Sequence, residues 1–159
     1  MLADKPRIWY TIANENFYLK GDITMAHAER TFVMLKPDCI KRGLVGEVIS
    51  RIERKGYRIV NAKIMWLDED LLRVHYAHLA DKPFFPEILS YMMSGPVLAM
   101  IVEGENAVTG VRILMGAAKF EEAAAGTIRG DFAMSTSENI IHGSDSPENA
   151  EAEIKRFFG

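Results

Sequence analysis

The sequence contains only one cysteine, Cys39, among 159 residues. One thiol cannot form an internal disulfide, and it cannot build a zinc site that needs several cysteines. The apolar runs are far shorter than the roughly 20 residues that a membrane-spanning helix needs. The N-terminal residues have mixed charge and no apolar segment typical of a secretory signal. We therefore expect a cytoplasmic protein that does not contact membranes.

Several catalytic motifs are missing as well. There is no Gly-x-x-x-x-Gly-Lys-Ser/Thr phosphate loop and no Gly-x-Gly-x-x-Gly dinucleotide motif. Ser144 lacks the Gly-x-Ser-x-Gly elbow of serine hydrolases. His75 and His78 are three residues apart, and a chance exposed pair explains them more simply than a zinc site. P-loop enzymes, dinucleotide-binding enzymes and serine hydrolases are thereby disfavoured.

The composition is that of an ordinary globular domain. Hydrophobic residues make up 48% and charged residues 26% of the chain, which is enough apolar material for one core. A formal net charge of -3 argues against bulk binding of nucleic acid, although a local basic pocket is compatible with it. We expect no nucleic-acid partner.

The most informative stretch lies near the C-terminal end, from Asn139 to Glu148. His142 follows two β-branched apolar residues and precedes a small polar run. Ser146 and Pro147 are typical of a helix start, which predicts a helix from Pro147 to Phe158. Loop amides and a helix N-terminus can face an anion there. We interpret His142 as a nucleophile that accepts a phosphoryl group, with a structural histidine as the alternative.

Residues 1–28 differ from the rest of the chain. Two apolar clusters, Ile8-Trp9-Tyr10 and Phe17-Tyr18-Leu19, are separated by mostly polar residues. They fit two short strands, a docked arm or an upstream extension, and Met25 would be a natural start. We expect an N-terminal extension of uncertain order over residues 1–28 and one domain over residues 29–159.

The domain alternates between strand and helix patterns. Apolar β-formers predict three strands, and helical spacing of apolar residues predicts four helices before the last one. The expected strands are 30–36, 57–66 and a central, fully apolar 97–102; the expected helices are 43–55, 68–78, one ending near 93, and 105–115. A short strand is also expected within the glycine-bracketed segment 126–132. This order predicts an α+β, ferredoxin-like βαββαβ fold with a mostly antiparallel four-stranded sheet.

Four basic side chains suit phosphoryl transfer. Lys36, Arg112 and Arg129 could neutralise phosphate oxygens, and His142 could attack in line. A histidine ordinarily has a pKa of about 6.5 and can be neutral near pH 7. Glu153, in the last helix, could orient the imidazole. For Lys36 alone, a solvated lysine at a strand end is the simpler interpretation.

Several segments together resemble the nucleoside diphosphate kinase family. The resemblance covers about residues 29–158, and many motifs in one order are far more specific than any single one. The matching segments are Arg30-Thr-Phe-Val-Met-Leu-Lys-Pro-Asp, Arg42-Gly-Leu-Val-Gly-Glu, His75-Tyr76, Lys82-Pro-Phe-Phe, Ser94-Gly-Pro-Val, Gly126-Thr-Ile-Arg-Gly-Asp and Asn139-Ile-Ile-His-Gly-Ser-Asp-Ser. It implies ping-pong transfer of a γ-phosphoryl group from a nucleoside triphosphate to a nucleoside diphosphate, with Mg²⁺ on the nucleotide.

The resemblance implies catalytic roles for four residues. His142 would be phosphorylated on Nδ1, and Glu153 would orient its ring. Ser144 would steady the histidine region, and Tyr76 would support the phosphate end of the pocket. No residue would bind the metal directly, but Asp145 could contact Mg²⁺ through water.

The resemblance to the family also implies that five residues bind the nucleotide. Lys36, Arg112 and Arg129 would bind phosphates, and Asn139 would contact the ribose. Phe84 would stack on the base, and such stacking tolerates different bases.

The chain departs from the family pattern in several places. Ala118 stands where the family usually has a threonine that binds phosphate, and Lys119-Phe120 also differ from the usual loop. Cys39 replaces a usual glycine, and its side chain is expected to strain the turn. The chain ends at Gly159, where members usually continue into a tail that packs on a neighbouring subunit. Self-association is expected, with a hexamer favoured over a tetramer.

Two other classes compete with an active kinase. A nucleotide-binding or regulatory relative with weak or lost turnover is suggested by Ala118 and the absent tail. A ferredoxin-like RNA binder is disfavoured because aromatic RNP-like strand motifs are missing and the net charge is negative.

Overall fold

The computed structural model describes residues 28–159 and contains a four-stranded antiparallel sheet. The strands are β1 (Ala28–Leu35), β2 (Arg58–Met65), β3 (Val97–Glu105) and β4 (Ile141–Gly143), in the spatial order β2-β3-β1-β4. β1 pairs with both β3 and β4, and β2 pairs with β3. The predicted α+β fold with an antiparallel sheet is confirmed. The clusters predicted near Trp9 and Tyr18 lie outside the described residues.

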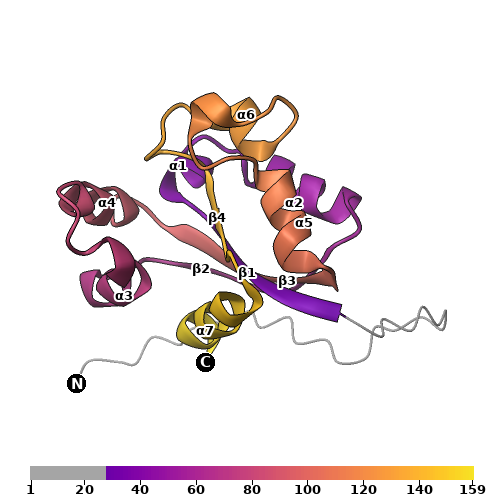
Figure 1. Ribbon diagram of the computed structural model, residues 1–159, viewed down its shortest axis with the longest axis horizontal. Helices are drawn as coiled ribbons and strands as arrows, with labels where there is room; N and C mark the ends of the chain where they lie inside the picture. Colours follow the sequence, from indigo (N-terminus) through magenta and orange to yellow (C-terminus); the bar gives the residue numbers. More distant parts are fainter. Residues whose placement is uncertain (1–27) are drawn as a thin grey trace, which may run out of the picture.

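Helices cover both faces of this sheet (Figure 1). One side carries α2 (Val45–Arg54), α5 (Ala107–Met115) and α6 (Ile128–Phe132). The other carries α3 (Glu69–His75), α4 (Phe85–Met92) and α7 (Pro147–Phe158). Short elements complete the described chain: α1 (Pro37–Lys41) and the 3-10 turns η1 (Ala77–Leu79) and η2 (Phe120–Glu122).

The alternation of side chains along β1 divides the core into two clusters. Val33 and Leu35 pack toward α2 and α5, whereas Phe32 and Met34 pack toward α3, α4 and α7. All four side chains are fully buried. A strand that is buried on both faces has a continuous run of apolar residues. β1 and β3 both contain such a run, and they are the central strands of the sheet. The prediction of a central third strand is confirmed.

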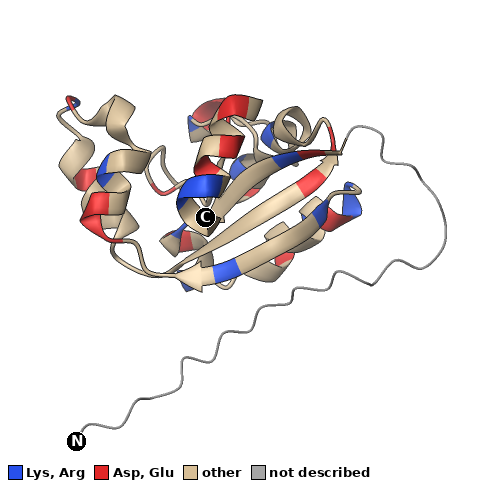
Figure 2. Ribbon diagram, turned by 90° about the horizontal axis from the view of Figure 1, so that it is seen from below, with Lys and Arg blue, Asp and Glu red and all other residues tan. Residues whose placement is uncertain are grey.

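Charged residues lie mainly on the helices and near strand ends (Figure 2). Within the sheet, Glu103 of β3 accepts a hydrogen bond from Arg30 Nε at 2.8 Å and another from Arg58. These bonds link three neighbouring strands across one face. None of the helices within residues 28–159 combines the length and apolar character that a membrane crossing requires.

Local capping signals predicted the helix starts well. Asp68 accepts a hydrogen bond from Leu71 N, and Ser146 accepts one from Asn149 N. Helix α3 ends at His75 rather than near residue 78, because the chain tightens into a 3-10 turn. The short helix α1 was not predicted.

Two predictions about local structure are wrong. Segment 126–132 contains helix α6, because the Thr127 side chain caps it by accepting a hydrogen bond from Gly130 N. The fourth strand is instead β4, which contains His142. The turn at Cys39 is not strained: Cys39 lies buried in α1, and the only non-glycine residues with positive φ in the described chain are Asn106 and Ile140.

Candidate active site

His142 lies on β4, opposite Met34 of β1, and is partly exposed. Its Nε2 is 3.0 Å from Oε1 of Glu153, a buried residue of α7. Ser144 Oγ donates to the other oxygen of Glu153 at 2.5 Å. The contact engages Nε2 of His142, so Nδ1 is the nitrogen left to act as a nucleophile. The sequence-based pairing of His142 with Glu153 is therefore matched by the geometry.

Glu153 is a carboxylate that its neighbours hold in the ionised form. Burial raises its pKa, but hydrogen bonds from His142 and Ser144 and the nearby imidazoles outweigh burial and lower the pKa overall. An ionised Glu153 can accept the Nε2 proton of His142. It therefore fixes the tautomer of the ring and can stabilise positive charge that develops on it.

His75 also belongs to this cluster and is buried, so its sequence-based interpretation as part of a chance exposed pair is wrong. Its side chain is fully buried, and its Nδ1 lies 3.6 Å from Glu153 Oε1 and 3.2 Å from Arg156 Nη1. Burial, aided by the His142 charge, lowers the pKa of His75 to about 3, so the ring is neutral. The sequence feature that could have identified His75 is its position beside Tyr76, in one of the segments that carry the family resemblance.

One possible ligand atom from each of His75, His142 and Glu153 lies within 4.8 Å of the other two, as in a metal site. The guanidinium of Arg156 contacts Nδ1 of His75 at 3.2 Å. A fixed positive charge there opposes a metal ion. The cluster is better suited to orienting an imidazole than to holding a cation.

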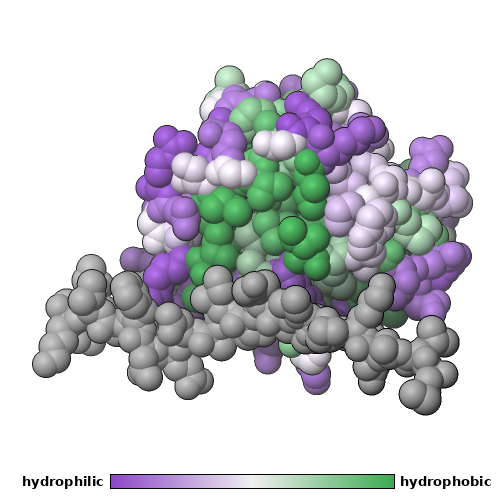
Figure 3. Space-filling view, turned by 180° about the vertical axis from the view of Figure 1, so that it is seen from behind, coloured by the Kyte–Doolittle hydropathy of each residue, from purple (hydrophilic) through white to green (hydrophobic). Residues whose placement is uncertain are grey.

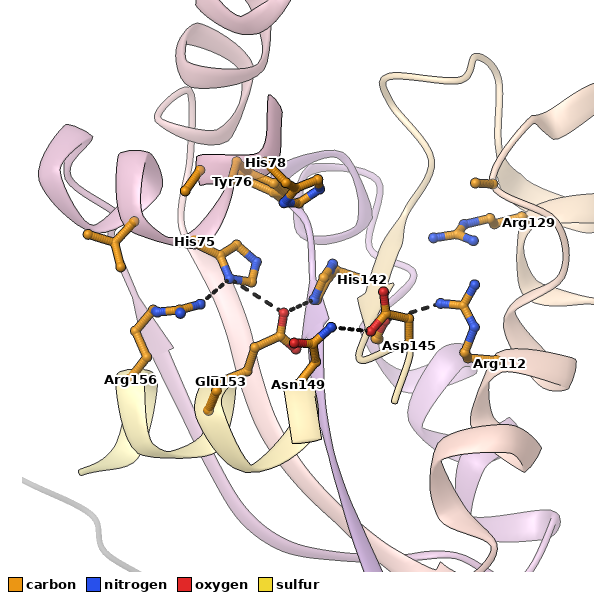
Figure 4. Close-up of a pocket in the computed structure, with 15 residues that line it drawn as sticks. His75, Tyr76, His78, Arg112, Arg129, His142, Asp145, Asn149, Glu153 and Arg156 are labelled. Carbon is orange, nitrogen blue, oxygen red and sulfur yellow. Dashed lines mark hydrogen bonds and ion pairs between the residues drawn. The ribbon is translucent and has the colours of Figure 1, made fainter. Parts of the chain in front are cut away.

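Arg129 is a buried cation tied to the backbone around the site. Its Nη2 donates to Ile141 O at 2.8 Å and its Nη1 donates to Gly116 O at 3.0 Å. Burial and the neighbouring Arg112 lower the pKa of Arg129 to about 10, so it stays charged at neutral pH. Figure 4 shows Arg112 and Arg129 on one side of His142 and Glu153 on the other. A phosphate beside His142 could therefore meet two guanidinium groups.

Lys36 supplies a third cation, at the end of β1. Its Nζ donates to Asn139 Oδ1 at 2.6 Å. Burial and then the charge of Arg129 lower the pKa of Lys36 to about 8, with Asp38 opposing the shift. Asn139 in turn donates from Nδ2 to Ala118 O at 3.3 Å and to Thr136 O at 2.9 Å. Lys36 is thus a constrained amine rather than a freely solvated one.

Two adjoining cavities bring the predicted residues together. One, of about 680 Å³, is bordered by His142, Glu153, Tyr76, Arg112, Arg129 and Asp145. The other, of about 570 Å³, is bordered by Lys36, Phe84 and Asn139. Tyr76 and Ala118 border both cavities. Of the predicted site residues only Ser144, almost fully buried behind Glu153, borders neither.

Polarity differs between the ends of this combined cavity. Phe84 is 45% exposed at the outer end and offers a flat apolar face. Tyr76 is buried, and burial raises the pKa of its hydroxyl, so it stays protonated. At the other end, Asp145 is exposed and its Oδ1 accepts from Asn149 Nδ2 at 2.5 Å. An aromatic face, three cations and an oriented imidazole form a site for an aromatic, phosphorylated molecule.

Comparison with known proteins agrees with this chemistry. A family model described as nucleoside diphosphate kinase matches residues 29–159. The nucleoside diphosphate kinase of Archaeoglobus fulgidus is 55% identical over 130 residues, which are 82% of this chain and 86% of that protein. Nucleoside diphosphate kinase A of Homo sapiens is 52% identical over 134 residues, which are 84% of this chain and 88% of that protein.

Solved structures give the same result. The halophilic nucleoside diphosphate kinase of Halobacterium salinarum, in complex with CDP, is 50% identical to this chain with a TM-score of 0.80. The match covers 83% of this chain and 88% of that one. The chain therefore belongs to the nucleoside diphosphate kinase family, and it is an enzyme that transfers the γ-phosphoryl group of a nucleoside triphosphate to a nucleoside diphosphate.

Proposed function

We propose that His142 is the residue that carries the phosphoryl group between the two nucleotides. The observation that supports this role is the 3.0 Å contact between His142 Nε2 and Glu153 Oε1 at the wall of a cationic cavity. In the first half-reaction the Nδ1 lone pair forms a bond to the γ-phosphorus. The bond from that phosphorus to the β–γ bridging oxygen breaks, and the nucleoside diphosphate leaves. A terminal oxygen of a second diphosphate then attacks the phosphorus, and the P–N bond breaks.

The surrounding residues are assigned by where they lie in the cavities. Arg112 and Arg129 would neutralise the oxygens of the transferred group, because their side chains border the same cavity as His142. Lys36 and Asn139 lie in the second cavity, together with the aromatic face of Phe84. The base would stack on Phe84, and Asn139 would contact the ribose. Tyr76 would support the phosphates where the two cavities meet.

A divalent cation fits the chemistry of this site as a companion of the nucleotide. Mg²⁺ bound to the phosphates supplies charge neutralisation and polarises the transferred group. Asp145 is the exposed carboxylate on this cavity and could reach such an ion through water. The chain's own cations bind and orient the same phosphates.

We also propose that the protein assembles with copies of itself through the outer edge of β2. Within the described chain β2 is one of the two edge strands of the sheet. Ile64 in this strand and Trp66 just after it have exposed side chains, 70% and 66% accessible. Figure 3 shows a contiguous apolar area on this side of the molecule. Unpaired edges with apolar side chains favour pairing between chains. The preference for a hexamer over a tetramer rests on the family resemblance.

The proposed domain division is a kinase domain over residues 29–159 after an extension over residues 1–28. The family match begins at residue 29, which supports this boundary. A cytoplasmic location is proposed from the single cysteine, which is buried and unpaired.

The decisive experiment is incubation with γ-labelled ATP. The wild-type protein is expected to acquire an acid-labile, base-stable label, typical of phosphohistidine, and to lose it when a nucleoside diphosphate is added. His142→Ala, folded by its melting curve, is expected to acquire none. Label on both proteins would show that a residue other than His142 accepts the phosphoryl group. No label on the wild type would favour a regulatory protein with lost turnover.

A further inference from the structure

The backbone just before His142 has an unusual conformation. Ile140 has a φ of 72°, a left-handed value that a β-branched residue rarely adopts. The N–H of Ile141 donates to the carbonyl of Asn139 at 2.8 Å, which closes a three-residue turn around Ile140. This is a γ-turn with positive φ at its centre, the rarer and more strained of the two forms. Strain of this kind persists only where the surroundings hold it.

The turn is held at both backbone groups of Ile140. Its N–H donates to Asp38 Oδ2 at 3.1 Å, and its carbonyl accepts from Lys36 N at 2.8 Å. Its side chain is fully buried in the core between the sheet and α5. Arg129 adds a bond to the carbonyl of Ile141. Of these contacts, only the bond to Asp38 relies on a carboxylate.

Asp38 is itself fixed by α4. The residue is almost fully buried, and its Oδ1 accepts from the hydroxyl of Tyr91 at 2.6 Å. Burial, reinforced by this hydrogen bond, raises the pKa of Tyr91, so its hydroxyl remains a donor. The Asp38 carboxylate therefore bridges two segments that are distant in sequence, the last turn of α4 and the turn before β4.

This turn controls two groups of the site at once. Asn139, at its first position, carries the side chain that accepts from Lys36 Nζ. Ile141, at its last position, begins β4 and directly precedes His142. If Ile140 relaxed to a negative φ, the path of β4 would change and the ring of His142 would move relative to Glu153. The geometry of the nucleophile thus depends on a turn that has to be clamped.

We propose that Asp38, steadied by Tyr91, is a positioning residue for phosphoryl transfer, which it serves by clamping the strained Ile140 turn and so aligning His142 with Glu153. The proposal rests on the proposed role of His142. Asp38 does not touch the reacting atoms; beside its electrostatic support of the charge on Lys36, its effect reaches them through the backbone from Ile140 to His142. Loss of the Asp38 clamp is therefore expected to slow the chemical step rather than to remove a phosphate contact directly.

The test compares Asp38→Asn and Tyr91→Phe with a matched control. Asp38→Asn keeps the shape but removes the charge, and Tyr91→Phe removes only the hydroxyl that holds Asp38. Glu29→Gln is the control, because Glu29 Oε2 also accepts a distant backbone N–H, that of Val108 at 2.8 Å, at the far end of β1. In rapid-quench experiments with γ-labelled ATP, both variants are expected to phosphorylate His142 about 10- to 100-fold more slowly, since small misplacements have effects of this size. The control is expected to match the wild type.

A spectroscopic measurement separates positioning from a general loss of stability. The Nε2 proton of His142, shared with Glu153, should give a resolved downfield NMR signal in the wild type. It should shift or broaden in both test variants and stay in place in Glu29→Gln. Phosphorylation within twofold of wild type, with that signal unmoved, in folded Asp38→Asn or Tyr91→Phe would overturn the role of Asp38. If the wild type acquired no label at His142, the proposed function would fail instead.

Discussion

Oε1 of Glu153 lies 3.0 Å from Nε2 of His142, although 11 positions separate the two residues in the chain. The contact engages Nε2 and places a carboxylate behind the ring, which leaves Nδ1 for the proposed attack on phosphorus. Glu153→Gln should slow phosphorylation of His142 by about 10- to 150-fold, because a hydrogen bond to a charged group contributes roughly 1.5–3 kcal/mol. Single-turnover kinetics would measure this.

The control for that change is Glu151→Gln, which removes one charge from an exposed position of the same helix. It should phosphorylate as the wild type does. Equal rates in Glu153→Gln and Glu151→Gln would show that the carboxylate does not assist His142.

The lowered pKa of Lys36 predicts that activity falls at alkaline pH. Its amine is charged below its pKa of about 8 and neutral above it, so phosphate binding by the free enzyme weakens as the pH rises through 8. We expect kcat/KM to decrease between pH 8 and pH 9.5. In Lys36→Arg this decrease should disappear, whatever the absolute rate, because arginine stays charged over that range. A wild-type profile that is flat to pH 9.5 would contradict the role of Lys36 as a phosphate ligand.

Phe84 predicts weak discrimination between bases. Phe84→Ala should raise KM about 5- to 150-fold, since stacking contributes roughly 1–3 kcal/mol per base. The increase should be similar for purine and pyrimidine nucleotides, because every base has a stacking face. The matched change is Met134→Ala, an apolar side chain that is 72% exposed and borders neither cavity. A KM in Phe84→Ala equal to that of the Met134 variant would place the base elsewhere.

Replacement of Ala118 by threonine is predicted to strengthen nucleotide binding. Ala118 borders both cavities, so a threonine there could add a hydroxyl contact to a phosphate. Ala118→Thr should lower the KM for nucleotide about 2- to 10-fold, the usual effect of one hydrogen bond of about 0.5–1.5 kcal/mol. Ala118→Val adds similar bulk without a hydroxyl and should not lower KM. Steady-state kinetics of the two variants would isolate the hydroxyl, and equal KM values would show that it makes no contact.

The outer edge of β2 predicts how the chain assembles. Ile64→Lys combined with Trp66→Glu should give species of smaller mass than the oligomer proposed for the wild type, because charges oppose pairing along an edge strand. Light scattering would give the solution mass. Val74→Glu, which places a charge on the exposed face of α3, is the control and should keep the wild-type mass. An unchanged mass in the double variant would exclude this edge as the interface.

Much of the fold was predictable because it depends on local preferences. The apolar run from Phe32 to Leu35 predicts a buried strand, and the pair Ser146-Pro147 predicts the start of α7. The candidate site residues were also proposed from the sequence, through the order of several matching segments. None of these predictions requires knowledge of distant contacts.

Other features could not be predicted because distant contacts decide them. β4 is only three residues long, and it exists as a strand because it pairs with β1. His75 appeared to be an ordinary helical histidine, yet packing against α7 places it beside Glu153. Local preferences oppose a left-handed Ile140, and it is stabilised by distant contacts, chiefly those to Asp38 and Lys36 and the core around its side chain.

By itself, the sequence determined the first three strands, the start of α7 and the identity of the chemical groups. The tertiary structure decided which nitrogen of His142 is occupied, how the two cavities join and how the turn before β4 is held. The physical reason is that local preferences act within a few residues, whereas these features depend on hydrogen bonds across the fold. The bond from Asp38 to Ile140 joins residues 102 positions apart.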